Sequence, residues 1–233
     1  MKENTVILKT NNLHKTYISG SLAVQAVRGI DLEVKKGEFV AIMGPSGSGK
    51  STLLNCLAAI DVPTQGDIWI EGENIAALSD DELAEIRLRR IGLVFQTFQL
   101  FELLTALENV AMPMTFLKMQ KKERNERALE LLRMVGLEAR AQHLPSELSG
   151  GEQQRIAVAR GLANEPPIIF LDEPTGDLDS KNSQMIMALL VSIHEQGKTL
   201  VMVTHDSDMA AYADRVLHMI DGKVVNEEIN NKT

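Results

Sequence analysis

A glycine-rich run between an apolar segment and a helix-like segment is the first part of the chain with a recognisable chemistry. Its spacing is G-x-x-x-x-G-K-S, and it consists of Gly44, Pro45, Ser46, Gly47, Ser48, Gly49, Lys50 and Ser51. Glycines let backbone amides turn inward around phosphate oxygens, and a following helix presents its unpaired amides to the same anion. Lys50 would reach the terminal phosphates, and the Ser51 hydroxyl is placed for a magnesium ion. The pattern predicts a nucleoside triphosphate site that extends to Thr52.

Two adjacent carboxylates follow an apolar run of strand length. Residues 168–171 are all apolar, and Asp172 and Glu173 come next. In open α/β sheets, ligands bind at the carboxyl ends of the strands. Asp172 is therefore a candidate magnesium ligand that acts through water. Glu173 is a candidate for orienting or deprotonating the attacking water.

A second helix start rich in serine and glycine lies later in the chain, at Ser149, Gly150 and Gly151. The Ser149 hydroxyl can cap a helix that we expect to run to Ala163, and the two glycines permit close approach of an anion. One chain would then carry two anion-binding helix starts.

The run from Leu148 to Arg155 closely resembles the L-S-G-G-Q signature of ABC proteins, with Glu152 in the position of the final glutamine. In that family the two helix starts of one nucleotide site come from opposite subunits. The resemblance therefore implies a homodimer that forms head to tail on binding ATP, with Mg²⁺ as the second cofactor.

Further residues are similar to ABC motifs, in the order in which the family has them, over essentially the whole chain. Tyr17 resembles the aromatic residue that stacks on adenine, and Gln96 resembles the glutamine that contacts Mg²⁺ and the attacking water. Asp179 lies in a segment similar to the D-loop at the dimer seam. His205 resembles the switch histidine at the γ-phosphate. By resemblance, Glu173, His205 and Gln96 are the catalytic residues.

Hydrophobic patterns predict the elements that position these residues. Continuous apolar runs indicate buried strands, and a Ser79-x-x-Glu82 capping box opens a helix. Strands are predicted at 5–8, 24–34, 39–43, 68–70, 91–95, 168–172, 199–204 and 215–219, and helices at 50–59, after Ser79, at 180–195 and over much of 105–163. This order indicates an α/β core interrupted by a helical insert.

The family resemblance makes that prediction more specific. It implies one ABC ATPase domain over residues 1–233, with a P-loop NTPase core of mixed sheet and helices and an N-terminal antiparallel β subdomain. The core and β subdomain are expected at about 1–95 and 165–228, and the inserted α-helical subdomain at about 96–164.

Composition limits the partners and the location. The chain has 233 residues and a net charge of −8, and this acidic balance argues against a nucleic-acid partner. Its one cysteine, Cys56, is expected to be a small core residue. Met1 to Asn4 lack the features of a signal peptide, and no run approaches the ~20 apolar residues of a membrane span. A membrane role would therefore come through a partner.

Among ABC proteins, three classes compete. Translation-type factors usually carry two motif sets, and chromosome- or repair-type ATPases have long coiled coils between their motifs. This chain has one motif set and no sustained heptads, which favours a transporter ATPase over such a soluble non-transport ATPase. Runs such as 92–96 and 104–110 are similar to LolD- and MacB-type ATPases of lipoprotein release and macrolide or peptide export. That implies a separate integral membrane permease, with this chain on the cytoplasmic face of the cell membrane.

Overall fold

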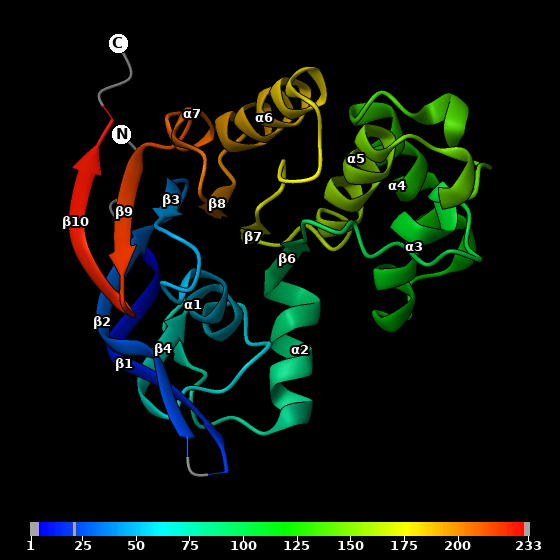
Figure 1. Cartoon of the computed structure of the whole chain (residues 1–233). Coiled ribbons are helices and arrows are strands. Elements are labelled where there is room, and N and C mark those ends of the chain that lie inside the picture. Colours follow the sequence, from blue (N-terminus) through cyan, green and yellow to red (C-terminus); the bar gives the residue numbers. More distant parts are fainter. Residues whose placement is uncertain (1–4, 21, 231–233) are drawn as a thin grey trace. The chain divides into compact units, whose positions relative to one another are not determined.

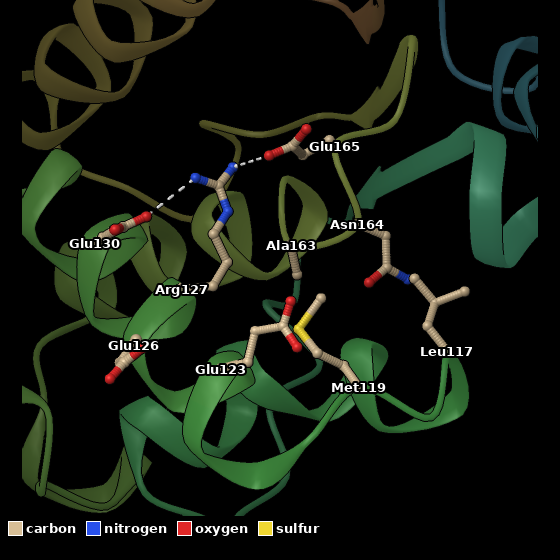
Figure 2. Close-up of a pocket in the computed structure, with 9 residues that line it drawn as sticks. All are labelled: Leu117, Met119, Glu123, Glu126, Arg127, Glu130, Ala163, Asn164 and Glu165. Atoms are coloured by element: carbon tan, nitrogen blue, oxygen red, sulfur yellow. Dashed lines mark hydrogen bonds and ion pairs between the residues drawn. The ribbon is translucent and has the colours of Figure 1, made fainter.

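The structure is a computed structural model that describes residues 5–20 and 22–230, except for the side chain of Ser19. Met1 to Asn4, in which we expected no signal peptide, lie outside the described residues. The chain forms two compact units, Met1–Arg87 with His194–Thr233, and Leu88–Ile193 (Figure 1).

The first unit contains an antiparallel sheet in the order β2-β1-β4-β5. Its strands are β1 (Val6–Ser19), β2 (Leu22–Lys35), β4 (Gln65–Ile70) and β5 (Glu73–Asn74). Strand β1 is much longer than the predicted 5–8. Its pairing with β2 shifts register between Thr10 and Leu13, and Asn12 has a φ of 46°. Such irregularities disrupt the alternation of polar and apolar residues by which a strand is recognised.

The first unit also contains strands of a second, mixed sheet. Strands β8 (Thr199–Thr204) and β9 (Arg215–Ile220) both pair in parallel with β3 (Phe39–Met43), and β10 (Lys223–Ile229) pairs antiparallel with β9. Residues 39–42 of β3 are buried, as predicted from the continuous apolar run, and every residue of β8 is buried as well. Strand β10 was missed because its residues are mostly polar and exposed.

The helices of the first unit follow from local sequence signals. Helix α1 (Lys50–Leu57) comes directly after the glycine-rich run, and the short α7 (Ser207–Ala210) follows β8. Helix α2 (Asp80–Arg90) extends across the boundary between the units. The backbone amide of Ser79 donates to the Glu82 carboxylate at 2.8 Å, which confirms the predicted capping box.

Cys56 is fully buried, and burial raises the pKa of its thiol to about 12.

The second unit combines two parallel strands with a group of helices. Strand β6 (Ile91–Val94) pairs with β7 (Ile168–Asp172). Helices α3 (Ala106–Phe116), α4 (Lys121–Met134) and α5 (Gly150–Gly161) contact one another. Helix α6 (Ser180–Glu195) and the 3₁₀ turns η1 (Glu138–Arg140) and η2 (Pro145–Glu147) complete the elements.

The observed elements confirm the predicted fold class. The fold is α/β, with an antiparallel β subdomain, parallel strands and a group of helices inserted between strands β6 and β7. Within the described ranges, no helix is both long and apolar enough to cross a bilayer. The exact boundaries of the helical subdomain, about 96–164, remain a prediction.

One arginine ties three parts of the first unit together. Arg215 on β9 donates through Nε and Nη2 to the Glu38 carboxylate, at 2.7 and 3.2 Å, and through Nη1 to Glu227 on β10 at 3.1 Å. Nη2 also donates to the Glu33 carbonyl. The side chains of Arg215 and Glu38 are only 15% and 16% exposed. Burial alone would lower the pKa of Arg215, but the bonds to Glu38 raise it overall.

We therefore expect Arg215→Ala to lower the free energy of unfolding by about 3 kcal/mol, because Glu38 would be left buried without its cation. Urea denaturation at neutral pH measures the loss. Arg133→Ala is the matched control, since Arg133 makes the same two-point contact with Glu138 at an exposed site. Equal midpoints for the two variants would contradict a structural role for the Arg215 contacts.

Candidate functional site

The glycine loop, residues 44–49, joins β3 to the start of α1. Gly49 is the N-cap, with a φ of 97°, and the helix has no side-chain cap and no acidic residue in its first turn. The first amides of α1 therefore face the loop without a resident carboxylate beside them. A helix start of this kind attracts an anion through its unpaired amides and the positive end of its dipole.

Two backbone segments lie so close to the loop that they explain two of its glycines, Gly44 and Gly49. A Cβ atom on Gly44 would lie 2.1 Å from the Met219 carbonyl oxygen, and one on Gly49 would lie 2.1 Å from the Ala26 carbonyl oxygen. Both neighbours are backbone atoms that cannot swing aside. The loop can keep its curvature only with glycine at these two positions.

Ser48 in the loop and Lys50 directly after it are buried polar residues. Lys50 is only 6% exposed, and its ammonium donates to the carbonyls of Gly44 and Pro45 at 2.9 and 3.0 Å. The Ser48 hydroxyl oxygen is buried and has no hydrogen-bond partner within the described residues. An orphaned hydroxyl in a curled, cationic loop is suited to an anionic ligand with many acceptor oxygens.

The sheet of the first unit brings His205 to the same edge as the glycine loop. Met43 of β3 pairs in register with Thr204 of β8, so Gly44 and His205 leave adjacent parallel strands at their carboxyl ends. The turn at His205 is fixed because the Asp206 amide donates to the Thr204 hydroxyl at 3.1 Å. The strand register therefore brings these two motifs to neighbouring strand ends, while the role of His205 toward a phosphate remains a prediction.

Tyr17 lies near the end of β1 and is 42% exposed. Its hydroxyl donates to the Asp61 carboxylate at 2.7 Å and also hydrogen bonds to the side chain of Thr52, on α1. Burial, followed by the bond to Asp61, raises the pKa of the Tyr17 phenol. The candidate adenine platform is thus bonded to the helix that begins the candidate phosphate site.

Strands β6 and β7 assemble a second group of predicted residues in the other unit. Val94 pairs in register with Leu171, so Gln96 and the pair Asp172-Glu173 follow neighbouring strand ends. The Gln96 side-chain nitrogen donates to the Asp177 carboxylate at 2.8 Å. Glu173 has a φ of 45°, a left-handed conformation that is unfavourable for a residue other than glycine. Such strain is concentrated at functional sites.

Gln154 positions this group and was not predicted from the sequence. It is fully buried on α5, and its side-chain nitrogen donates to the carbonyls of Phe95 and Pro174 at 3.2 and 2.7 Å. One amide therefore joins the residue before Gln96 to the residue after Glu173. One of two adjacent glutamines in a polar stretch gives no sequence signal of burial.

Helix α5 begins at Gly150, within the segment that resembles the signature motif, and Ser149 is its N-cap. The Ser149 hydroxyl accepts from the Glu152 amide, and the Glu152 carboxylate accepts from the Ser149 amide and hydroxyl at 2.9 and 2.7 Å. This confirms the predicted cap. Bonds from Ser149, followed by the charge of Arg140, lower the pKa of Glu152 despite partial burial. Unlike α1, this helix start carries its own carboxylate.

The predicted D-loop residue Asp179 has a structural role at the start of α6. Its carboxylate accepts from the amide and the side-chain nitrogen of Asn182, both at 2.8 Å. A Cβ atom on Gly151 would lie 2.2 Å from the Asn182 side-chain oxygen, and one on Gly150 would lie 3.4 Å from the Phe98 ring. The starts of α5 and α6 and the segment after Gln96 are therefore packed together. The role of Asp179 toward a nucleotide remains a prediction.

Comparison with known proteins identifies the family. The model of the ABC transporter family matches residues 27–176. The chain belongs to the ABC transporter family. It is 51% identical over 227 residues to the ABC transporter ATP-binding protein MJ0796 of Methanocaldococcus jannaschii, covering 95% of this chain and 97% of that protein. It is also 50% identical to the macrolide export ATP-binding/permease protein MacB of Chlorobium phaeobacteroides.

A solved structure extends this likeness to the fold. The dimeric post-hydrolysis state of MJ0796 bound to ADP and Pi has a TM-score of 0.90 to this chain at 49% identity, covering 97% of this chain and 100% of that one. The present chain is accordingly the ATP-binding ABC ATPase of a transporter. The match to MacB covers 95% of this chain but only 34% of the MacB protein, so it concerns about a third of that relative.

We expect Lys50→Ala to weaken ATP binding about 10- to 100-fold, because the phosphates would lose a charge-assisted partner. The fold should survive, since the amides of α1 and the glycine loop remain. Equilibrium titration with a fluorescent ATP analogue measures the affinity, and circular dichroism checks the fold. Lys223→Ala, at an exposed position of β10, is the control. Near-normal affinity in folded Lys50→Ala would contradict the assignment.

Proposed function

We propose that two copies of this chain close head to tail on ATP and thereby power a separate membrane subunit of the lipoprotein-release or macrolide/peptide-export type. The observation that carries the proposal is the pair of unlike helix starts in one chain. Helix α1 offers an uncapped start beside Lys50, whereas α5 offers a capped start with Ser149, Gly150 and Gly151. The 50% identity to MacB and the dimeric form of MJ0796 support it.

The proposed nucleotide site draws on both copies. Tyr17, residues 44–52, Gln96 and Asp172 of one copy hold ATP, and residues 149–151 of the other copy complete the contact with the γ-phosphate. Asp179 contributes at the seam between the copies. ATP favours closure because it binds the closed pair better than the open one.

The residues proposed for magnesium have the donor atoms that this ion prefers. Ser51 offers a hydroxyl, Asp172 a carboxylate and Gln96 an amide oxygen, and Mg²⁺ takes hard oxygen ligands. The bond from Gln96 to Asp177 uses the side-chain nitrogen, which leaves the amide oxygen as the donor toward a cation. When bound, Mg²⁺ supplies charge neutralisation for the phosphate oxygens.

The proposed chemistry assigns the remaining residues. The Glu173 carboxylate accepts a proton from the attacking water or orients it, while His205 contacts the γ-phosphate. Gln154 holds the backbone at Phe95 and at Pro174, the residue after Glu173. The Glu173 carboxylate is therefore positioned before the nucleotide arrives. Loss of the γ-phosphate removes the contact that holds the two copies together, and the dimer reopens.

The contact with the membrane subunit is proposed for the segment after Gln96 and the helical subdomain at about 96–164. Phe101 and Leu103 in that segment are 47% and 91% exposed. Exposed apolar side chains are suited to a protein partner. This contact would hold the chain at the cytoplasmic face of the cell membrane.

Glu173→Gln should trap the ATP-bound dimer. Glutamine keeps the size of the side chain but cannot take a proton, and losing general-base help costs about 10²–10⁴-fold in rate. ATP should still bind, because the glycine loop and Lys50 are unchanged. Light scattering after gel filtration should show a dimer of the variant only with ATP. Hydrolysis at the wild-type rate, or a monomer with ATP demonstrably bound, would rule out Glu173 as the catalytic carboxylate.

Ser149 should act on the ATP bound by the other copy. We expect Lys50→Ala and Ser149→Arg subunits to be inactive separately and to regain ATPase activity when mixed. In a mixed dimer, one site receives both substitutions and the other receives neither. Steady-state ATPase assays of the mixture test this. If mixed dimers form and no activity returns, each site is built within one chain.

A further inference from the structure

Three residues form a charged cluster at the candidate adenine platform. The Tyr17 hydroxyl donates to Asp61 Oδ2 at 2.7 Å, and the Lys15 ammonium donates to Asp61 Oδ1 at 2.5 Å. The same ammonium lies 5.0 Å from the centroid of the Tyr17 ring. Asp61 therefore connects to the ring both directly through the hydroxyl and indirectly through the cation above it.

Asp61 is itself fixed to helix α1. Its backbone amide donates to the Asn55 carbonyl at 3.1 Å, next to the bond from Ile60 to the same carbonyl. The segment that follows is bonded to β1, since the Thr64 amide donates to the His14 carbonyl and the Thr16 amide donates to the Thr64 hydroxyl. The carboxylate thus lies in a frame shared by α1 and β1.

Lys15 is held in place as firmly as the carboxylate. Its side chain is only 12% exposed, and the ammonium also donates to the Val62 carbonyl at 2.7 Å. Burial raises the pKa of Asp61, but the bonds from Lys15 and Tyr17 outweigh burial and lower it overall. The carboxylate therefore stays ionised at neutral pH, and the cluster stays paired.

We propose that Asp61 and Lys15 are positioning residues that hold the Tyr17 ring in the orientation that stacks on adenine. The inference rests on the proposed function, in which Tyr17 binds the base. The hydroxyl is fixed by Asp61 and by Thr52 of α1, and one face of the ring is occupied by the Lys15 ammonium. Tyr17 is 42% exposed, and in the proposal the base stacks on the ring face opposite Lys15. Because α1 also begins the phosphate site, the cluster fixes the spacing between the base and the phosphates.

Two ligands distinguish binding of the base from binding of the phosphates. Asp61→Ala should raise Kd and KM for ATP about two- to tenfold, the factor that corresponds to immobilising one side chain on binding. The kcat and the affinity for inorganic tripolyphosphate, which has no base, should stay the same. Asp61→Asn should recover part of the loss, because its amide oxygen still accepts from Tyr17. Calorimetry with each ligand and magnesium, together with steady-state kinetics, measures these quantities.

Two further variants complete the test. Tyr17→Phe keeps the ring and removes the hydroxyl, so it should weaken the binding of ATP but not that of tripolyphosphate. This variant tests the inference even if Asp61→Ala does not fold. Glu33→Ala is the control, because it removes a carboxylate that pairs with Lys9 of the same sheet at 2.7 Å. It should change the affinity for neither ATP nor tripolyphosphate.

Two results would overturn the inference. One is an equal loss of affinity for ATP and tripolyphosphate in Asp61→Ala, which would mean that Asp61 supports α1 and not the ring. The other is wild-type ATP affinity in Tyr17→Phe and in folded Asp61→Ala. Failure of the wild-type chain to bind ATP would instead overturn the proposed function.

Discussion

The uncapped start of α1 is the constraint on which the site depends. A helix start without a side-chain cap leaves its first amides unpaired, and here it is reached through Gly49 in a left-handed conformation. The carbonyls of Met219 and Ala26 come so close to Gly44 and Gly49 that only glycine fits. The candidate anion site is therefore shaped by the packing of β2 and β9 as much as by its own residues.

The two helix starts differ in a way that suits different tasks. At α1 the Lys50 ammonium donates to the loop carbonyls, whereas at α5 the Glu152 carboxylate already accepts from Ser149. A resident carboxylate competes with an incoming phosphate for the same donors. Helix α5 should therefore bind an anion more weakly than α1. In the proposed dimer, this suits a contact that forms only on closure and is released after hydrolysis.

The sequence predicted what is encoded locally. The glycine loop, the cap at Ser149 and the buried strand β3 follow from short patterns, and the structure has all three. Gln154 and Asp61 could not be predicted, because their partners lie 59 and 44 positions away along the chain. Polar residues of this kind look like surface residues until the fold supplies their partners. Strand β1 was predicted too short because its irregular pairing removes the alternating pattern.

Besides carrying the signature motif, helix α5 donates side-chain hydrogen bonds to two segments with unfavourable backbone conformations. Phe98 and Gln99 are consecutive residues with positive φ, and their carbonyls accept from Arg160 on α5 at 2.9 and 2.5 Å. Gln154, on the same helix, holds the backbone beside Glu173, which also has a positive φ. Unfavourable backbone conformations persist only where their surroundings enforce them. Helix α5 therefore holds the backbone at both places, in the segment proposed to contact the membrane subunit and next to the proposed catalytic carboxylate.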